Sequence, residues 1–493
     1  MKILLLNPPF KSEFGRFSRE QRSPAITKGG TFYFPMFLCY AAGVLEQAGF
    51  DVLLTDGPAS QMSHSEVYEK AKAFAPDMII VDTSTPSIYN DIEMAEQLKQ
   101  VTGALTVLVG THPAIMVEET LGMSDKVDAI ARKEYEYTLR DLAQKISIAG
   151  GHIDETILES VKGLSFKWEG KIKNNPDRQP IENLDELPFV SGVYKKHLNI
   201  RDYFYTIAQH PQVAIYSGRG CPHQCIYCVY PQVMHGHRYR NRSVDNLIEE
   251  FKYIEHELPE VREIFIEDDT FTVDRKRVAA FSKAYQNAKL KISWIANSRA
   301  DTDHDTLRAL RLCNCRLLCV GFESGDQGVL NTMNKRLNVE DAKTFVKNAR
   351  NQGILIHGCF MVGNPGETWE TLEKTLEYAK MLNPDTAQFF PIMVYPGTKA
   401  YDWAKENRYL LSEDYSQWNT ATGLHNCMIS RPGLSNVELV EFCDRARKEF
   451  YLRPRYILYR LLRLLKHPIE DGPRMIKSVS VFKKFLFKGT FDR

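Results

Sequence analysis

The chain has 493 residues, enough for about three domains. Its 63 Lys and Arg residues nearly balance 62 Asp and Glu residues, so overall charge does not indicate a polyanionic partner. Ten cysteines, three of them in one short motif, favour a reducing compartment over a disulfide framework. No apolar stretch reaches the roughly 18 residues of a membrane-spanning helix, and the apolar run at the N-terminus is too short for a signal peptide. We therefore expect a cytoplasmic protein.

Residues 1–150 alternate short apolar runs with helix-length amphipathic segments, which predicts a parallel sheet with crossover helices. The expected strands are Lys2–Asn7, Asp51–Thr55, Asp77–Asp82, Leu105–Val109 and Asp128–Ala131. In such sheets ligands bind beyond the carboxyl ends of the strands. No G-x-G-x-x-G motif follows the first strand, which argues against a nicotinamide dinucleotide.

Residues 151–205 are expected to connect two domains. Residues 164–175 alternate apolar and polar side chains around Glu169-Gly170, which predicts a small hairpin. Residues 176–188 are polar and bounded by prolines, as linkers are.

Within residues 206–400, Cys221, Cys225 and Cys228 have C-x₃-C-x₂-C spacing. Three thiolates this close can ligate one iron–sulfur cluster, and a [4Fe–4S] cluster with three cysteines keeps one iron open for a ligand. The alternatives are a zinc site and three unrelated cysteines. A zinc site normally needs a second pair of ligands, and none is visible in the sequence.

This spacing resembles the signature of the radical S-adenosylmethionine (SAM) enzymes. In that family the open iron binds SAM, and the reduced cluster cleaves SAM to a 5′-deoxyadenosyl radical. The family also has an aromatic residue before the third cysteine, near the adenine, and Tyr227 has that position.

Six strands alternate with helices between residues 213 and 394, which predicts the partial (β/α)₆ barrel of these enzymes. The expected strands are Val213–Ser217, Glu263–Glu267, Ile292–Ala296, Arg316–Gly321, Ile354–Val362 and Ala387–Val394. The resemblance implies SAM contacts at the strand ends from Glu267, Asp269, Glu323, Ser324, Gly363, Pro365 and Gly366.

Several of these residues have a second interpretation. Asp269 or Thr270 would also cap the next helix. Arg299 would bind the SAM carboxylate through its bidentate guanidinium or form a surface salt bridge. A second cluster is conceivable, but small core residues fit the strand spacing better for Cys313, Cys315 and Cys319.

The first domain resembles the cobalamin-binding domain that precedes the barrel in many radical SAM enzymes. The resemblance rests on Asn7-Pro8-Pro9 and on Gly110-Thr111-His112-Pro113 after two of the strands. It implies cobalamin contacts from Asn7, Thr83, Ser84, Gly110 and His112. The chain lacks the Asp-x-His-x-x-Gly motif that supplies an axial histidine, and His112 alone is more typical of a turn-capping residue. Bound and lost cobalamin therefore both stay open.

Residues 401–493 are expected to be helical. From Tyr451 onward there are 11 Lys and Arg against three Asp and Glu, interleaved with aromatic residues and leucines. This pattern is typical of basic amphipathic helices that lie on a membrane surface. The alternative is a helix packed on the barrel with a solvated basic face. No nucleic-acid-binding motif accompanies the charge, so no nucleic acid is expected.

Four segments resemble the hopanoid-biosynthesis radical SAM enzymes, which contract a ring on a lipid: LPFVSGVYKKHL, HPQVAIYSGRGC, PQVMHGHRYRNRS and VYPGTKAYDWAKEN. The resemblance implies hydrogen abstraction from an apolar or lipid-linked substrate, with electrons from a reductant such as ferredoxin or flavodoxin. His235, His237 and residues 297–301 depart from that branch and leave the substrate open. The alternatives are a cobalamin-dependent radical SAM methyltransferase acting on an unactivated carbon and a non-catalytic, membrane-associated iron–sulfur scaffold.

Overall fold

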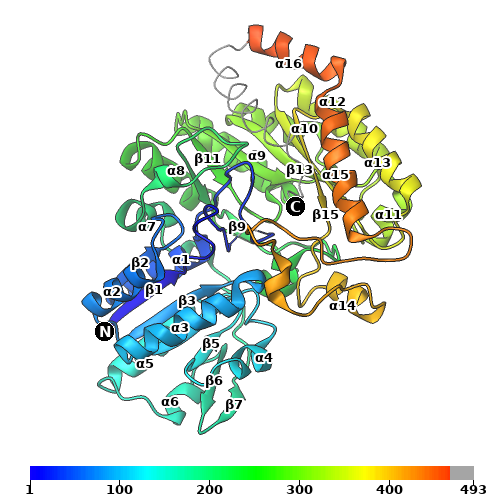
Figure 1. The fold of residues 1–493 in the computed structure, drawn as a ribbon. Coiled ribbons are helices and arrows are strands. Elements are labelled where there is room, and N and C mark those ends of the chain that lie inside the picture. Colours follow the sequence, from blue (N-terminus) through cyan, green and yellow to red (C-terminus); the bar gives the residue numbers. More distant parts are fainter. Residues whose placement is uncertain (21, 467–493) are drawn as a thin grey trace.

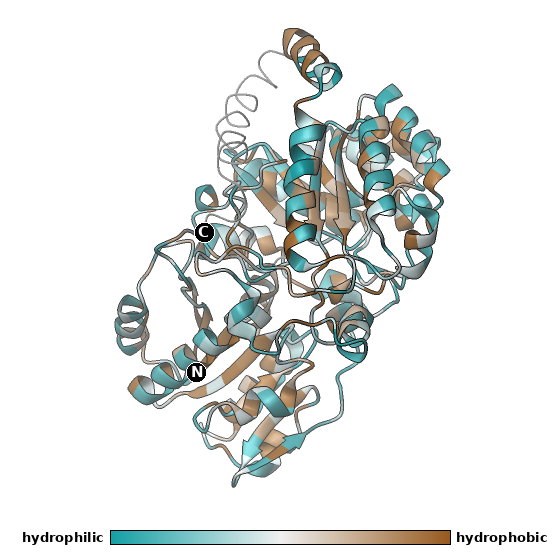
Figure 2. Ribbon diagram, turned by 45° about the vertical axis from the view of Figure 1, so that its right-hand side comes forward, coloured by the Kyte–Doolittle hydropathy of each residue, from teal (hydrophilic) through white to brown (hydrophobic). Residues whose placement is uncertain are grey.

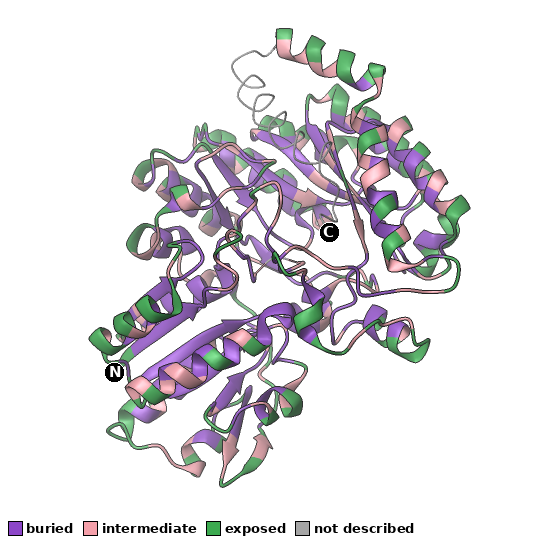
Figure 3. Ribbon diagram, in the orientation of Figure 1, coloured by how far each residue is buried: buried purple, intermediate pink, exposed green. Residues whose placement is uncertain are grey.

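The computed structural model describes residues 1–20 and 22–466, which fold into two α/β units lying against each other (Figure 1). In both units the strands are mostly buried, and the outer faces of the helices are exposed (Figure 3). No described helix is both long enough and apolar enough to span a membrane. The predicted α/β class, a parallel sheet followed by a partial barrel, is confirmed.

The first unit is built on a seven-stranded sheet with the order β2-β1-β3-β4-β5-β6-β7. Its parallel strands lie within one residue of their predicted bounds: β1 Lys2–Asn7, β2 Asp51–Asp56, β3 Met78–Thr83, β4 Leu105–Gly110 and β5 Ala129–Ala131. The hairpin of β6 (Leu164–Trp168) and β7 (Lys171–Asn174) extends this sheet in the antiparallel direction. The helices of this part are α1 Met36–Gln47, α2 His64–Phe74, α3 Ile88–Thr102, α4 Val117–Gly122, α5 Glu136–Ile148, α6 Glu155–Glu159 and α7 Val190–His197.

The second unit is a curved, all-parallel sheet of six strands in the order β15-β14-β13-β12-β11-β8. The strands are β8 Gln212–Ile215, β11 Glu263–Ile266, β12 Ser293–Ser298, β13 Cys315–Glu323, β14 Leu355–Val362 and β15 Thr386–Pro391. The helices that alternate with them are α8 Val244–Glu257, α9 Arg275–Asn287, α10 His304–Leu312, α11 Gln327–Thr332, α12 Val339–Asn351 and α13 Trp369–Leu382. β8 and β15 each pair on one side only, so the barrel is open between them.

Polar caps decide where the barrel helices begin. Ser243 caps α8, and Thr368 forms a capping box at the start of α13. The predicted cap of α9 was wrong, because residues 271–273 first form a 3₁₀ turn and Asp274 then accepts the N–H of Arg277. The carboxylate of Asp269 therefore does not cap a helix. It lies just after β11, at the carboxyl ends of the barrel strands, which are called the barrel mouth below.

A long segment between β1 and α1, residues 8–35 without residue 21, lies between the two units and is called the N-terminal segment below. Near the first sheet, Arg19 Nη1 donates to Asn7 Oδ1 at 2.8 Å. Farther along, Phe32 and Phe204 exchange backbone hydrogen bonds, and the ring of Phe34 stacks on Tyr203 at 3.8 Å between centroids. The segment therefore joins the first sheet to the start of the barrel.

The C-terminal part adds α14 (Lys399–Glu406), a 3₁₀ turn at Tyr415–Trp418, α15 (Asn436–Tyr451) and α16 (Pro454–Lys466). α15 packs against β15. Helix α16 anchors one face to Asp385 through Tyr456, Tyr459 and Arg463. Its other face exposes Ile457, Leu458, Leu461, Leu462 and Leu465 (Figure 2). The remainder of the predicted basic tail lies outside the described residues.

Candidate active site

The three cysteines lie on the loop that follows the first barrel strand. Cys221 and Cys225 are buried and Cys228 is partly exposed. Burial raises the pKa of the Cys228 thiol; Asp269 raises it further, Arg22 opposes this effect, and Cys225 and Cys221 add to it. The three thiols thus lie on one short loop beside the same charged groups, as the ligands of one iron–sulfur cluster would.

The loop is held by contacts that the sequence analysis missed. Asp268 accepts the backbone N–H of Ser217 at 2.7 Å and of Gly218 at 2.9 Å, just before the cysteines. The side-chain amide of Gln232 donates to the carbonyl oxygens of Ile226 and Cys228. Both residues act on backbone groups, so their role can be inferred only once the loop's path is known.

At the end of β13, the partly exposed Tyr227 forms a polar group with the buried side chains of Glu323 and Lys335. Tyr227 Oη and Lys335 Nζ donate to Glu323 Oε1 at 2.9 and 2.8 Å, while Glu323 Oε2 has no partner among the described residues. Burial opposes the charge of Lys335, but Glu323 outweighs it and raises the lysine pKa. Glu323 has a φ of +63°, a strained conformation that is typical of functional positions.

Just after β11, the N-terminal segment places Arg22 between two carboxylates. Its guanidinium lies 3.3 Å from Glu267 Oε2 and 3.2 Å from Asp269 Oδ1. Burial raises the pKa of Glu267. Although burial also acts on Asp269, His235 and Arg22 keep the pKa of that carboxyl below its usual value. Arg22 was not predicted, because 245 residues separate it from Glu267.

Two predicted SAM contacts, Ser324 and Arg299, have other partners in the structure. Ser324 is fully buried and its hydroxyl bonds to Thr375 on α13 at 3.0 Å, so it fixes the turn after β13. Arg299 contacts Asp301 and donates to the carbonyls of Lys335 and Arg336. Arg299 is therefore neither an exposed salt-bridge residue nor free to bind the carboxylate of SAM. Its hydrogen bonds hold the loop that carries Lys335.

The turn after β14 also differs from the prediction. The backbone amides of Gly363 and Asn364 donate to the carboxylate of Glu367 and are not left for a ligand. A Cβ on Gly363 would lie 2.9 Å from Leu439, so close packing against α15 explains this glycine. The carbonyl of Pro365 accepts a hydrogen bond from Thr332 on α11, and Gly366 lies against the same side chain.

The five residues predicted to contact cobalamin lie at the carboxyl edge of the first sheet, called the crevice below, and all five are buried. Asn7 donates to Asp56 at 3.0 Å, and Thr83 donates to the carbonyl of Val109 at 2.7 Å. Ser84 bonds to Ser87 at 2.7 Å. A Cβ on Gly110 would lie 2.2 Å from the carbonyl oxygen of Thr83, so only glycine fits there.

His112 is buried in this crevice and bonds through Nδ1 to Thr85 at 3.2 Å, while Tyr415 packs edge-on against its ring. Burial lowers the pKa of His112 to about 3. Five buried polar atoms of the crevice and of the strand ends and helix beside it have no hydrogen-bond partner among the described residues. They are Thr55 Oγ1, Asp82 Oδ2, His112 Nε2, Tyr135 Oη and Glu136 Oε2. Buried polar groups are normally hydrogen-bonded, so this set fits a ligand rich in amide groups, as cobalamin is.

Two family descriptions match the two units. Residues 215–379 match the radical SAM superfamily, and residues 22–143 match the B12 binding domain. The first range contains the cysteine loop and most of the barrel, and the second contains most of the crevice. Fold and site together define a radical SAM enzyme with a cobalamin-binding domain.

Two curated relatives cover nearly the whole chain. An uncharacterized methyltransferase of Pyrococcus horikoshii is 30% identical over 460 residues, which cover 93% of this chain and 94% of the relative. The anaerobic magnesium-protoporphyrin IX monomethyl ester cyclase of Rubrivivax gelatinosus is 26% identical and covers 93% of this chain and 80% of that enzyme.

The fold is also similar to a solved structure. The radical SAM methyltransferase TsrM from Kitasatospora setae, with cobalamin and a [4Fe–4S] cluster bound, superposes with a TM-score of 0.65 at 16% identity, covering 84% of this chain and 76% of TsrM. This chain belongs to the cobalamin-dependent radical SAM enzymes, whose cofactors are a [4Fe–4S] cluster, SAM and cobalamin.

Proposed function

We propose that this chain is a methyltransferase that modifies an unactivated carbon with the help of SAM, a [4Fe–4S] cluster and cobalamin. The identity to the Pyrococcus horikoshii methyltransferase over nearly the full length of both chains supports this activity. When bound, the cluster and SAM supply hydrogen abstraction, and cobalamin supplies the methyl group. The hopanoid ring contraction suggested by short segments has no counterpart among the relatives described above.

The observation that carries the proposal is the closeness of the two sites. Arg19 pairs with Asp91 in the crevice, and Arg22 pairs with Glu267 and Asp269 at the barrel mouth. Residues three positions apart have Cα atoms at most about 11 Å apart. Both sites therefore adjoin the same short stretch of the N-terminal segment, which supports a direct transfer between them.

We assign the residues of the mouth as follows. Cys221, Cys225 and Cys228 hold the cluster. Tyr227 and Glu323 border the SAM site on one side, and Glu267 and Asp269 border it on the other. The paired carboxylates and the cation of Arg22 would orient a zwitterionic amino acid group such as the methionine end of SAM. Asp268 and Arg299 position these groups without contacting SAM.

For the crevice we propose that cobalamin lies against residues 83–85, whose backbone packs closely on Gly110. The low pKa keeps His112 neutral, and its buried Nε2 atom has no partner among the described residues. Its ring is held by Thr85 and Tyr415, which fits a hydrogen-bonding role better than movement toward a metal.

The test is an anaerobic assay of reconstituted protein with SAM, a reduced flavodoxin and candidate substrates, a hopanoid lipid and a magnesium porphyrin ester. Methyl transfer predicts 5′-deoxyadenosine and S-adenosylhomocysteine in similar amounts. Deoxyadenosine alone, together with a rearranged product, would replace this proposal by the ring-contraction activity. A chain that binds SAM but leaves it uncleaved under all conditions would favour the scaffold alternative.

We further propose that α16 contacts an anionic membrane surface. Its exposed face carries Leu458, Leu461 and Leu465, and Arg455 and Arg460 flank it. Basic amphipathic helices bind membrane interfaces by burying their apolar face and by attraction of their basic residues to anionic lipids. The protein should sediment with phosphatidylglycerol vesicles and not with phosphatidylcholine vesicles, and Leu458→Ser/Leu461→Ser should abolish the difference. If the variant and the wild type sediment equally with phosphatidylglycerol vesicles, α16 is instead a helix with a solvated face.

A further inference from the structure

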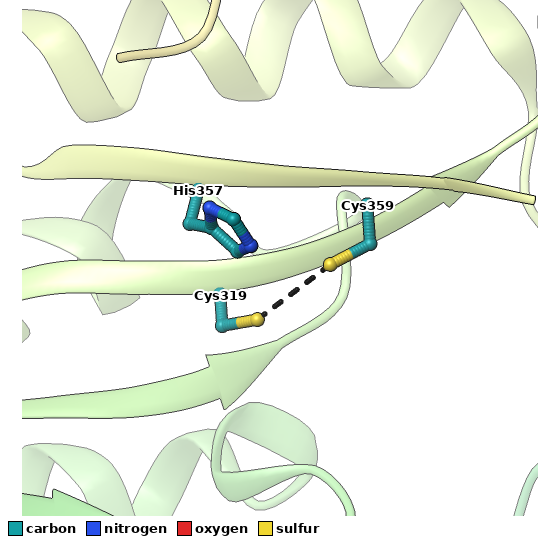
Figure 4. A group of neighbouring side chains, drawn as sticks. All are labelled: Cys319, His357 and Cys359. Carbon is teal, nitrogen blue, oxygen red and sulfur yellow. Dashed lines mark hydrogen bonds between the residues drawn. The ribbon is translucent and has the colours of Figure 1, made fainter. Parts of the chain in front are cut away.

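Halfway along the barrel, three side chains from two neighbouring strands converge: Cys319 on β13, and His357 and Cys359 on β14 (Figure 4). Cys319 pairs with His357 in the strand register, and Cys359 is two residues farther along β14. All three are partly exposed although they are in mid-strand. The sequence analysis interpreted Cys319 as a small core residue and did not consider the other two.

These side chains face the lumen and not the surrounding helices. The alternate residues Phe322 and Phe360 are fully buried and point outward, where Phe322 meets Phe345 of α12. Because side chains alternate along a strand, Cys319 and Cys359 must lie on the inner face. The group is therefore in the space that a substrate would enter.

The geometry fits one shared ion. The ligand atoms of the three residues lie within 4.8 Å of one another, and the two sulfur atoms are 3.8 Å apart. Zinc binds thiolate at about 2.3 Å in tetrahedral sites, which places two such sulfurs about 3.8 Å from each other. One ring nitrogen of His357 bonds to Thr386 Oγ1 at 2.8 Å, the outer contact that orients metal-binding histidines.

A disulfide is a poorer explanation. The two cysteines are diagonal neighbours on parallel strands, and a strand spacing of about 4.8 Å with a rise of about 6.6 Å over two residues puts their Cα atoms about 8 Å apart. Disulfides need Cα atoms closer than about 7 Å. Cys313 and Cys315 also stay apart from the group, since their sulfur atoms contact backbone carbonyls.

We infer that Cys319, Cys359 and His357 form a zinc site separate from the iron–sulfur cluster. Two thiolates and an imidazole select a borderline-soft ion such as Zn²⁺ over Mg²⁺ or Ca²⁺. Three protein ligands leave the fourth position open, as in catalytic zinc sites, and it faces the lumen. If the proposed methyl transfer is correct, this position would hold an oxygen, nitrogen or sulfur atom of the substrate.

The site lies next to the SAM-binding residues. Cys359 pairs with Gly321 in the strand register, and a Cβ on Gly321 would lie 2.2 Å from Glu323 Oε1 and 2.8 Å from Lys335 Nζ. The Glu323 side chain thus folds over the position beside Cys359. A substrate atom bound to the ion would sit directly beneath the mouth, within reach of the chemistry performed there.

The experiment measures metal in the full-length protein without any substrate, so its result does not depend on methyl transfer. Zinc and iron are quantified by mass spectrometry after cluster reconstitution and dialysis. One zinc per chain is expected beyond the cluster iron, and Cys319→Ser/Cys359→Ser should lower it at least tenfold. The matched control Cys313→Ser/Cys315→Ser alters two cysteines outside the group and should keep the zinc.

A second measurement excludes zinc bound to empty cluster ligands. In the Cys221→Ala/Cys225→Ala/Cys228→Ala background, Co²⁺ should give a tetrahedral spectrum with thiolate charge transfer, and Cys359→Ser should remove part of that band. Absence of both zinc in the wild-type chain and this cobalt spectrum in the cluster-free background would overturn the inference, even if some variants do not fold. Equal zinc in the wild type and in the Cys319→Ser/Cys359→Ser variant would overturn it as well.

Discussion

The barrel mouth and the crevice of the first sheet border the same N-terminal segment, but their polar groups are arranged differently. In the crevice, Asn7, Arg19, Asp56 and Asp91 bond to one another and are each at most 4% exposed. At the mouth, Tyr227 and Cys228 are partly exposed, and a carboxylate oxygen of Glu323 has no partner within the described chain. Buried polar atoms without a partner in the described chain occur in both regions. The regions therefore differ in exposure: the mouth is partly open, whereas a fully buried network of ion pairs and hydrogen bonds adjoins the crevice.

The largest effect is expected from the cluster loop. Cys225→Ala removes one of three ligands, and a cluster with two cysteines should not keep the open iron that SAM needs. SAM cleavage should fall to the background of the cluster-free chain, measured as deoxyadenosine formed under reducing conditions. Cys313→Ser is the control, because that thiol donates to carbonyls of α10 and is no part of the cysteine loop. Full activity of the Cys225 variant would contradict our assignment of the cluster ligands.

Next comes the buried ion pair of the crevice. Arg19→Met leaves Asp91 as an unpaired buried carboxylate, which costs about 3–5 kcal/mol of unfolding free energy. Arg19→Met/Asp91→Leu should recover much of this loss, as measured by denaturant unfolding. If Arg19→Met alone were as stable as the wild type, the ion pair of Arg19 and Asp91 would not stabilise the fold.

The two regions also differ in what the sequence could reveal. The cysteine loop is a local motif, and the strands follow from apolar runs, so these were predicted within a few residues. The contacts Arg22–Glu267 and Cys319–Cys359 join residues 245 and 40 positions apart, and no local pattern marks them. Ser324 and Gly363 were placed near SAM by motif, but a motif does not say which side of a turn a side chain occupies. Their packing against α13 and α15 became visible only in the fold.

Buried carboxyl groups in both regions predict a loss of stability as pH rises. Burial raises the pKa of Glu367, in the turn after β14, to about 7, and it raises that of Asp82, in the crevice, to about 8. Each folded pKa lies above the unfolded value of about 4, so the folded chain binds more protons and becomes less stable across that window. For Glu367 the loss between pH 4.5 and pH 7 is at most about 3 kcal/mol.

Asp82→Asn and Glu367→Gln should each flatten the dependence of unfolding free energy on pH from 4.5 to 8, with the larger change for Asp82. The control is Glu66→Gln, because Glu66 is an exposed capping residue on α2. A slope that neither buried variant alters would mean that these carboxyls are not protonated in the folded chain.

The smallest effect is expected at the mouth, from the pair of Glu323 and Lys335. Glu323→Gln keeps an oxygen that can accept from Lys335 and Tyr227, so the free energy of unfolding should fall by only about 1–2 kcal/mol. The SAM affinity, measured by calorimetry on the reconstituted protein, should fall more clearly because the unpartnered carboxylate oxygen is lost. Lys335→Met is the matched change on the other partner, and it leaves Glu323 buried without its cation. Both variants could instead lose as much stability as Arg19→Met and still bind SAM normally. The polar groups of the mouth would then be a structural network like that of the crevice, and the contrast between the two regions would disappear.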